Sequence, residues 1–302
     1  MQLHYCRIHG GNFGDDLNLD LWPRLFPDIA HVHPGTRFYG IGTILGGEQP
    51  AGPKVILGSG VGYRGKAKPD PQRQVYWVRG PRTAACLGID PALGLGDPAL
   101  LWPALDHPRS PVAGRVGLVP HFRSLERYDW AAMADAAGVH LIDPRMTPDA
   151  VVAAIGTCER VLCESLHGAI CADAMGVPWR ALVLARRFND FKWRDWLDGL
   201  GLELRPAEMP VELLDRLKPM KALGNAAMRL LDFGGPEARQ QMRPLRAAGA
   251  REHRLAVRAL GLLAAETGAF QVSDRARVAA QREAMRARCA NFARDHGIAF
   301  AG

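Results

Sequence analysis

Short apolar segments alternate regularly with helix-like segments between residues 115 and 184, and this alternation constrains the fold more than any other feature. The strand candidates are rich in β-branched and aliphatic residues, and the segments between them have helical spacing. The strand candidates are residues 115–119, 139–142, 160–163 and 180–184, and the helix candidates are residues 129–137, 148–155 and 166–175. Strands that alternate with helices predict a parallel sheet covered on both faces. Thr147 and Pro148 also suit the N-cap and first turn of the second helix.

The first hundred residues show a looser version of the same pattern. Strands are expected at residues 38–45, 54–57 and 75–78, and a helix at 16–26 after a glycine-rich turn. A segment rich in proline and aspartate, 105–111, separates this half from the next. We therefore expect an α/β protein of two Rossmann-like domains, residues 1–108 and 109–270, followed by residues 271–302.

Residues 273–296 predict one long C-terminal helix that packs back onto a domain. Its narrow apolar face carries Val278, Met285, Cys289 and Phe292, and Gly297 supplies its stop. Residues 216–296 contain 16 Lys and Arg against 7 Asp and Glu, so they hold the excess positive charge of a chain whose net charge is +7. This basic character fits a solvated face or an anionic membrane surface. Because few aromatic residues are interleaved with the charges, nucleic acid is not an expected partner.

Composition excludes several classes of protein. Hydrophobic residues make up 48% and charged residues 23% of the chain, a balance typical of globular domains. No apolar stretch is long enough to span a membrane, and the N-terminus lacks the pattern of a secretory signal. The six cysteines form no Cys-x-x-Cys pair, so we expect reduced thiols in a cytoplasmic protein rather than disulfides or a zinc site. No metal site and no cofactor are predicted.

In an open parallel sheet, ligands bind beyond the carboxyl ends of the strands. The polar residues expected at these ends in the second half are His121, Arg123, Glu164, His167 and Lys192. A histidine at the start of a helix and among basic residues forms an anion site that also holds a proton donor. His167, in the sequence Glu-Ser-Leu-His-Gly-Ala, fits this description best. His121 also fits an ordinary loop histidine, and Lys192 a solvated lysine.

The first half contributes a different set of polar residues. Gly-Asn-Phe-Gly-Asp-Asp places Asn12, Asp15 and Asp16 in a tight turn before a helix, where one carboxylate can cap the helix and the other can serve as an acid or base. Arg79 ends a strand, and an arginine at that position suits bidentate binding of a carboxylate or phosphate. Arg82, in the first turn of the next helix, is expected to face solvent.

Residues 60–65 match the glycine spacing of a dinucleotide-binding turn. In such a turn the last glycine must open a helix whose N-terminus holds the pyrophosphate. Pro69 and Pro71 follow too soon for that helix. The glycines therefore favour a loop that approaches the cleft between the two halves, and not a nicotinamide site.

Nine motifs in a fixed order resemble the polysaccharide pyruvyl transferases, and in particular the exopolysaccharide ketalases of the succinoglycan type. They cover about residues 1–200 and are GNFGDDLN (11–18), GIGTIL (40–45), GSGVG (58–62), VRGPRTA (78–84), GDPALL (96–101), VGLVPH (116–121), IDPR (142–145), ESLHGA (164–169) and KWRDW (192–196). The resemblance implies a glycosyltransferase-B-like arrangement with the active site between two Rossmann-like halves. It also implies transfer of a pyruvyl group from phosphoenolpyruvate onto two hydroxyls of one sugar, with release of phosphate.

The same resemblance assigns roles to individual residues. The family's donor-binding arginine falls on Arg79, its catalytic histidine on His167 and its lysine on Lys192, and an acidic residue of the glycine loop falls on Asp15 or Asp16. Many members have Arg-Leu-His where this chain has Ser165-Leu166-His167, so another cation, Arg123 or Arg82, is expected to supply the missing charge. The acceptor implied is a lipid-linked oligosaccharide at the cytoplasmic face of the membrane.

The residue types fit this chemistry. His167 would protonate the donor and contact its phosphate, Asp15 or Asp16 would act as base on the acceptor hydroxyl, and Arg79 and Lys192 would clamp the donor. Two other functions remain open at this point. One is a glycosyltransferase of the same architecture that uses a nucleotide sugar, with Glu164 near its ribose, and the other is a family member without activity. Residues 210–270 suggest no function.

Overall fold

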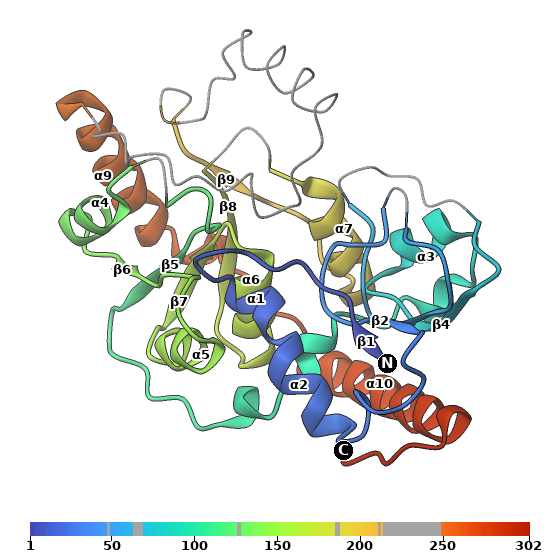
Figure 1. Cartoon of the computed structure of the whole chain (residues 1–302). Helices are drawn as coiled ribbons and strands as arrows, with labels where there is room; N and C mark the ends of the chain where they lie inside the picture. The colour runs from blue at the N-terminus through green and yellow to red at the C-terminus, as the bar shows by residue number, and fades with distance from the viewer. Residues whose placement is uncertain (47–48, 63–68, 126–127, 185–187, 211–212, 214–248) are drawn as a thin grey trace, which may run out of the picture.

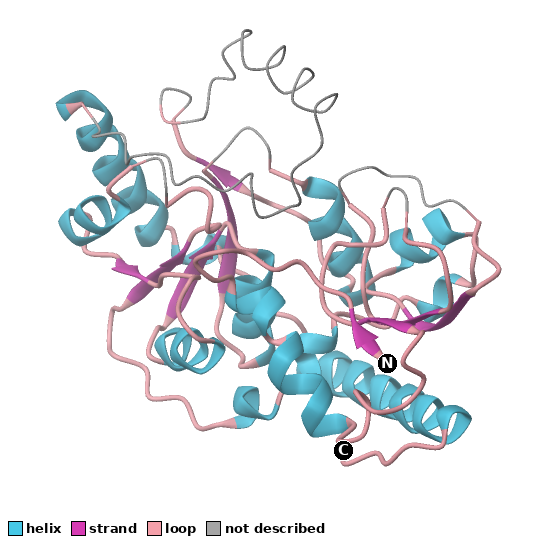
Figure 2. Ribbon diagram, in the orientation of Figure 1, coloured by secondary structure: helices cyan, strands magenta, loops and turns pink. Residues whose placement is uncertain are grey.

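Two parallel β-sheets, each flanked by helices, form the framework of the chain (Figures 1 and 2). The computed structural model describes residues 1–46, 49–62, 69–125, 128–184, 188–210, 213 and 249–302. The first sheet has the order β1-β2-β3-β4, with strands Gln2–Leu3, Arg37–Tyr39, Lys54–Leu57 and Arg73–Trp77. The second has the order β6-β5-β7-β8-β9; from β5 to β9 its strands are Val116–Val119, His140–Leu141, Arg160–Cys163, Trp179–Val183 and Ala207–Glu208. Mixed α/β structure with parallel sheets, consistent with Rossmann-like folds, is thereby confirmed.

The helices lie between and around these sheets. They are α1 (Phe13–Asp16), α2 (Asn18–Leu25), α3 (Pro81–Leu87), α4 (Trp130–Ala136), α5 (Pro148–Gly156), α6 (Leu166–Ala174), α7 (Asp190–Leu200), α9 (Ala250–Ala265) and α10 (Arg275–His296). Four short 3-10 turns complete the described elements, namely η1 (Pro91–Leu93), η2 (Pro98–Leu101), η3 (Pro103–Asp106) and η5 (Thr267–Ala269).

The second sheet is buried on both faces, as the alternation of residues predicts. Leu118, Leu162 and Leu182 point into a cluster with α4 and α9. Their neighbours Val161 and Cys163 point the other way, into a cluster with α5 and α6. Successive strand residues point to opposite faces, so each strand needs apolar residues at every position.

The largest hydrophobic cluster runs through both halves of the chain. It contains Trp22, Phe38 and Trp77 of the first half, Ile170 of α6, and Phe292 of α10. The Phe292 ring lies 4.9 Å from Phe26, 5.7 Å from Phe38 and 5.3 Å from Tyr76, measured between ring centroids. Helix α10 therefore covers one face of the first sheet, with the four predicted apolar residues buried, and it ends at Gly297 with φ +62° (Figure 1).

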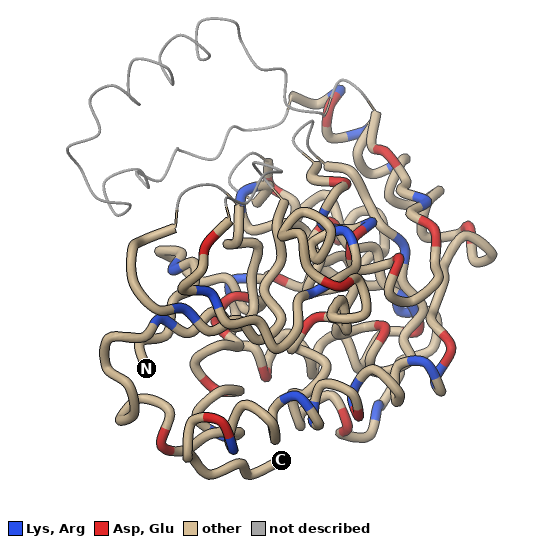
Figure 3. Tube along the Cα trace, turned by 90° about the vertical axis from the view of Figure 1, so that its right-hand side faces the viewer, with Lys and Arg blue, Asp and Glu red and all other residues tan. Residues whose placement is uncertain are grey.

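Several arginines of α10 bond to the protein itself. Arg275 donates to the carbonyls of Asp173 and Ala174 at the end of α6, and Arg277 donates to the Leu200 carbonyl at the end of α7, over 2.7 Å. Cations are favourable at helix C-termini, where the last carbonyls lack partners. Part of the positive charge thus caps other helices. In Figure 3 the basic and acidic positions are interspersed over the view.

The strand predicted at residues 38–45 is wrong in length. It ends at Tyr39 because the next backbone groups turn to a side chain: Ile41 donates to Asn18 Oδ1 over 2.8 Å, and its carbonyl accepts from Asn18 Nδ2 over 2.9 Å. Gly42 then has φ +136°, which breaks the strand. The predicted helix at 16–26 begins earlier, at Phe13, and is divided at Leu17 into α1 and α2.

Candidate active site

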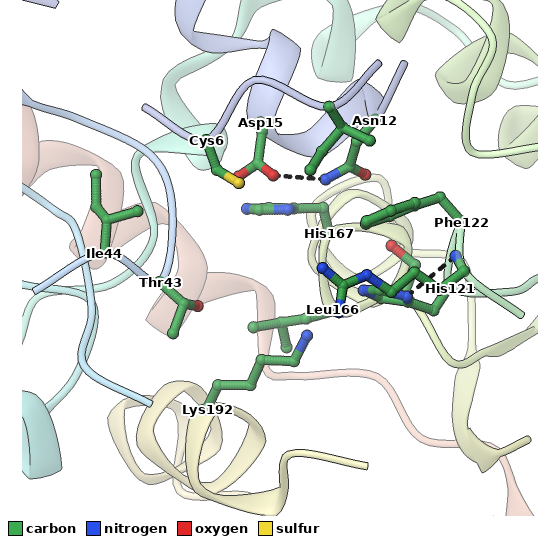
Figure 4. Close-up of a pocket in the computed structure, with 13 residues that line it drawn as sticks. Cys6, Asn12, Asp15, Thr43, Ile44, His121, Phe122, Leu166, His167 and Lys192 are labelled. Atoms are coloured by element: carbon green, nitrogen blue, oxygen red, sulfur yellow. Dashed lines mark hydrogen bonds between the residues drawn. The ribbon is translucent and has the colours of Figure 1, made fainter. Parts of the chain in front are cut away.

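A pocket of about 340 Å³ opens where the first half meets the strand ends of the second sheet (Figure 4). In the second sheet β5 lies between β6 and β7. The chain therefore leaves β5 toward β6 on one side, and the later strands β7, β8 and β9 are added on the other side. Such a divergence between β5 and β7 leaves a crevice at the carboxyl ends of the two strands, where ligands bind. The pocket is lined by Cys6, Ile8, Asn12, Asp15, Thr43, Ile44, His121, Phe122, Arg123, Ser165, Leu166, His167 and Lys192.

His167 stands in the first turn of α6, directly after β7. Ser165 is the N-cap of this helix, and its hydroxyl accepts from the Gly168 amide over 3.3 Å. Ser165 therefore fixes the start of the helix that carries His167. The imidazole Nε2 lies 3.5 Å from Oδ2 of Asp97, a residue of the first half that is 1% exposed.

The Asp97 carboxylate is a buried charge beside His167. Burial acts to raise the pKa of Asp97, but the His167 imidazole, the Ala99 amide and Arg79 together hold that pKa below its ordinary value. Oδ1 of Asp97 accepts from the Ala99 amide over 3.0 Å as the cap of η2. The carboxylate is therefore ionised at neutral pH and faces the imidazole.

The two aspartates of the glycine loop have different tasks. Asp16 Oδ2 accepts from the Asn12 amide over 3.0 Å, so Asp16 closes the start of α1. Asp15 lines the pocket and accepts from Asn12 Nδ2 over 2.6 Å. Its side chain and that of Asn12 lie on the same side of the His167 ring (Figure 4). Burial raises the pKa of Asp15, against His167, Asn12 and Lys192, which lower it. A carboxylate with a raised pKa is a stronger base.

Lys192 and Arg123 bring positive charge to the pocket wall. Lys192 comes from the first turn of α7, and no carboxylate pairs with its Nζ among the residues that the structure describes. Arg123 is exposed and lies over the Phe122 ring, 5.5 Å from its centroid. The two side chains approach from different elements, which suits an anion with charge at both ends.

His121 and Glu164 form hydrogen bonds that hold the loop carrying Arg123. Glu164 is buried and its Oε2 accepts from the His121 amide over 2.8 Å, while His121 Nδ1 accepts from the Arg123 amide over 3.3 Å. His121 lines the pocket, whereas Glu164 lies behind it. The predicted strand-end residues of the second half are therefore brought together as expected.

Arg79 does not line the pocket. Its guanidinium is 1% exposed and donates to Asp195 Oδ2 over 3.1 Å, to Thr43 Oγ1 over 2.8 Å and to the Val61 carbonyl over 2.8 Å. A Cβ on Gly60 would lie 2.3 Å from this guanidinium, so the glycine-rich turn encloses an arginine. Arg79 is connected to the pocket only by its hydrogen bond to Thr43, a lining residue. In this geometry it cannot contact a donor bound in the pocket. Arg82 pairs with Asp198 at the surface, away from the pocket.

Three residues of the site were not predicted as functional. Asp97 occurs in the GDPALL motif (96–101), where it was given no role, and Thr43 occurs in a predicted strand. Asp195 lies in a helix that the sequence did not indicate. Only the tertiary structure brings Asp97 to His167 and Asp195 to Arg79.

Comparison with known proteins identifies the family of the chain. The family model for polysaccharide pyruvyl transferases matches residues 8–184, which include most of the pocket. The chain belongs to the polysaccharide pyruvyl transferase family. It is also 41% identical over 220 residues to the succinoglycan biosynthesis protein ExoV of Rhizobium meliloti (strain 1021), covering 70% of this chain and 68% of that protein. No solved structure matches.

Family membership makes this chain a transferase that acts on polysaccharide. The described residues contain no group of three or more His, Cys, Asp and Glu placed to hold a metal ion. None of the helices in the described part of the chain is both long and apolar enough to cross a membrane.

Proposed function

We propose that this transferase moves the pyruvyl group of phosphoenolpyruvate onto two hydroxyls of a sugar in an exopolysaccharide or its lipid-linked repeat unit. The observation that carries the proposal is the pocket itself, where a histidine at a helix N-terminus, a carboxylate and two cations meet. The donor has a phosphate and a carboxylate at either end of a short carbon skeleton, so it needs cations on two sides. The relative ExoV supports the exopolysaccharide acceptor.

Lys192 and Arg123 bind the two anionic ends of the donor in this proposal. The N-terminus of α6 adds backbone amides and the positive end of the helix dipole. Arg79 was expected to bind the donor directly. In this proposal it acts indirectly, because it is bonded to Thr43 of the pocket lining and to Asp195 of α7. Asn12 orients Asp15 by its hydrogen bond of 2.6 Å.

The reaction needs one proton donor and one base. His167 gives its proton to C3 of phosphoenolpyruvate, which makes C2 electrophilic. Asp15 takes the proton of the attacking hydroxyl, and a C2–O bond forms. The second hydroxyl then displaces phosphate from C2, which closes the cyclic ketal and releases inorganic phosphate with the remaining proton. Groups placed in this way each contribute about 10²- to 10⁴-fold to the rate.

We also propose a glycosyltransferase-B-like arrangement, with residues 1–108 and 109–270 as the two halves. Two parallel sheets, a pocket at their junction and the return of α10 to the first sheet support it. All six cysteines are free, which supports a reducing, cytoplasmic compartment. Contact with anionic lipid stays a prediction for the basic C-terminal region.

Thermal stabilisation by phosphoenolpyruvate tests the donor without knowledge of the acceptor. A ligand at 100 times its Kd adds about 2.7 kcal/mol to the stability of the folded state. We expect this shift in the wild type and its loss in Lys192→Ala. Phosphate release with unpyruvylated polysaccharide should fall at least ~100-fold in folded His167→Ala. Stabilisation by nucleotide sugars in place of phosphoenolpyruvate would mean that the chain is a glycosyltransferase.

A further inference from the structure

We propose that Asp97 is a positioning residue that holds Nε2 of His167 away from the substrate and leaves Nδ1 for proton transfer. The inference rests on the proposed function and deepens it, because it says which nitrogen does the chemistry. No motif reasoning assigned a role to Asp97. Its case rests on geometry, burial and charge.

The orientation of the Asp97 carboxylate is fixed from one side. Oδ1 accepts from the Ala99 amide over 3.0 Å, so Oδ2 is turned toward the imidazole, with Nε2 3.5 Å away. Neither Oδ2 nor Nε2 is exposed to solvent, and within the described part of the chain neither has another hydrogen-bond partner. Each of these atoms therefore has the other as its polar neighbour.

The negative charge of Asp97 favours its pairing with the His167 imidazole. A buried carboxylate without a counter-charge is strongly unfavourable, so a proton on Nε2 is favoured there. Two carboxylates interact with His167, Asp97 at the start of η2 and Asp15 of α1; Arg79 acts in turn on Asp97, and Lys192 and Asp16 act on Asp15. When Nδ1 has given its proton to the substrate, the neutral ring keeps the proton on Nε2 next to Asp97.

Sterics hold the other side of the ring. A Cβ on Gly14 would lie 2.0 Å from Nδ1 and 2.4 Å from Cγ of His167, so the ring packs directly on the backbone of α1. Phe13 adds an edge contact, with ring centroids 6.5 Å apart. The imidazole thus lies between α1 and η2, both from the first half, although His167 belongs to the second half. The position of the His167 ring is therefore fixed only when the first half packs against the second.

Asp97→Asn tests this role while keeping a residue that caps η2 well. We expect kcat to fall about 10- to 100-fold, with the KM for phosphoenolpyruvate changed less than about threefold. Because the imidazole loses its negative neighbour, the pH profile of kcat should change as well. Asp173→Asn is the matched control, since Asp173 is as buried but bonds to Trp179 and Ser273. It should lower stability and leave the profile in place.

A second measurement needs neither a variant nor substrate. Histidine-selective ¹⁵N NMR of the wild type, with His167 assigned by His167→Gln, reports the tautomer of the neutral ring. We expect the Nε2–H form. A Nδ1–H form, or an Asp97→Asn enzyme with an unchanged kcat and pH profile, would overturn the inference. If the wild type releases no phosphate from phosphoenolpyruvate, the proposed function fails, and the tautomer still decides the role of Asp97.

Discussion

The guanidinium Nε of Arg79 lies 3.1 Å from Oδ2 of Asp195, and both side chains are buried. Arg79 follows the last strand of the first sheet, and Asp195 belongs to α7, which lies between β8 and β9 of the second sheet in sequence. Asp195 also accepts from the amide of Thr83 over 2.8 Å and from its hydroxyl over 2.6 Å. Helix α7 is therefore held against α3, one turn beyond Lys192. This buried pair fixes the position of a pocket cation.

Loss of the Asp195 carboxylate should destabilise the protein strongly. Asp195→Ala leaves Arg79 buried without its counter-charge, and breaking a buried pair in this way costs about 3–5 kcal/mol. The free energy of unfolding in urea measures the effect. The matched control is Asp198→Ala, which removes the surface partner of Arg82 on the same two helices and should cost less than about 1 kcal/mol. Equal losses in the two variants would contradict the assignment.

Much of the second half could be predicted from the sequence. Strand 160–163 is confirmed to the residue, and α5 begins at Pro148 with Thr147 as its cap, because these elements carry local signals. A helix after the strand at 75–78 was expected and is α3, whereas helices α7 and α9 were not predicted. Helix α7 carries two tryptophans and three aspartates among its 11 residues and shows no simple apolar stripe, and Trp193, Asp195 and Trp196 are all buried. Its burial depends on α3 and β8, which no local pattern reveals.

The part of the site that lies at the carboxyl ends of strands could be predicted from the sequence. His121, Arg123, His167 and Lys192 line the pocket because the carboxyl ends of parallel strands meet at one edge. Arg79 follows the same rule, and yet it is buried behind the wall. Whether a strand-end arginine faces a ligand or a buried aspartate depends on a distant helix, and the sequence does not encode that contact locally.

Gly14→Ala should inactivate the enzyme more than it unfolds it. Alanine is normally favoured over glycine inside a helix by about 0.5–1 kcal/mol. Here its Cβ would lie 2.0 Å from Nδ1 of His167, so the ring must move out of the pocket. We expect kcat to fall at least ~100-fold in a folded protein. Gly261→Ala, in α9 with open space around it, is the control and should be slightly stabilised and fully active. Normal activity of Gly14→Ala would show that the ring position is not critical.

Asp15→Asn should stabilise the protein while abolishing activity. Burial raises the pKa of Asp15, so the fold favours its protonated form. Its contribution to stability is present at low pH and is lost as the pH rises through the folded-state pKa. The variant should therefore exceed the wild type in urea midpoint at pH 8, and the difference should shrink as the pH falls through the raised pKa of Asp15 toward the ordinary value of 3.8. Asp16→Ala should instead destabilise the protein. Its free energy of unfolding should fall by about 1 kcal/mol, because the variant loses the hydrogen bond from the Asn12 amide. A destabilised Asp15→Asn at pH 8 would contradict the sign.

Arg123 and Ser165 allow a test of whether Arg123 supplies the charge that the family resemblance leads us to expect at position 165. Both line the pocket, and Arg123 extends from the loop after β5 while Ser165 caps α6. If Arg123 binds the donor through a charge-assisted hydrogen bond worth about 1.5–3 kcal/mol, Arg123→Ala should raise the KM for phosphoenolpyruvate roughly 10- to 100-fold. Adding Ser165→Arg should recover much of this loss, because it returns a cation to the same pocket.

The control for that recovery is Ser165→Ala in the Arg123→Ala background. Both substitutions at position 165 remove the cap on the Gly168 amide and should cost about 1 kcal/mol of stability, but only arginine adds charge. Steady-state kinetics with varied phosphoenolpyruvate separates the two effects, since a lost cap lowers the melting temperature while a lost cation raises KM. Recovery with alanine as well as arginine would mean that charge is not what position 165 supplies. An unchanged KM in Arg123→Ala would remove Arg123 from the donor site and leave Lys192 and the α6 N-terminus to bind the anion.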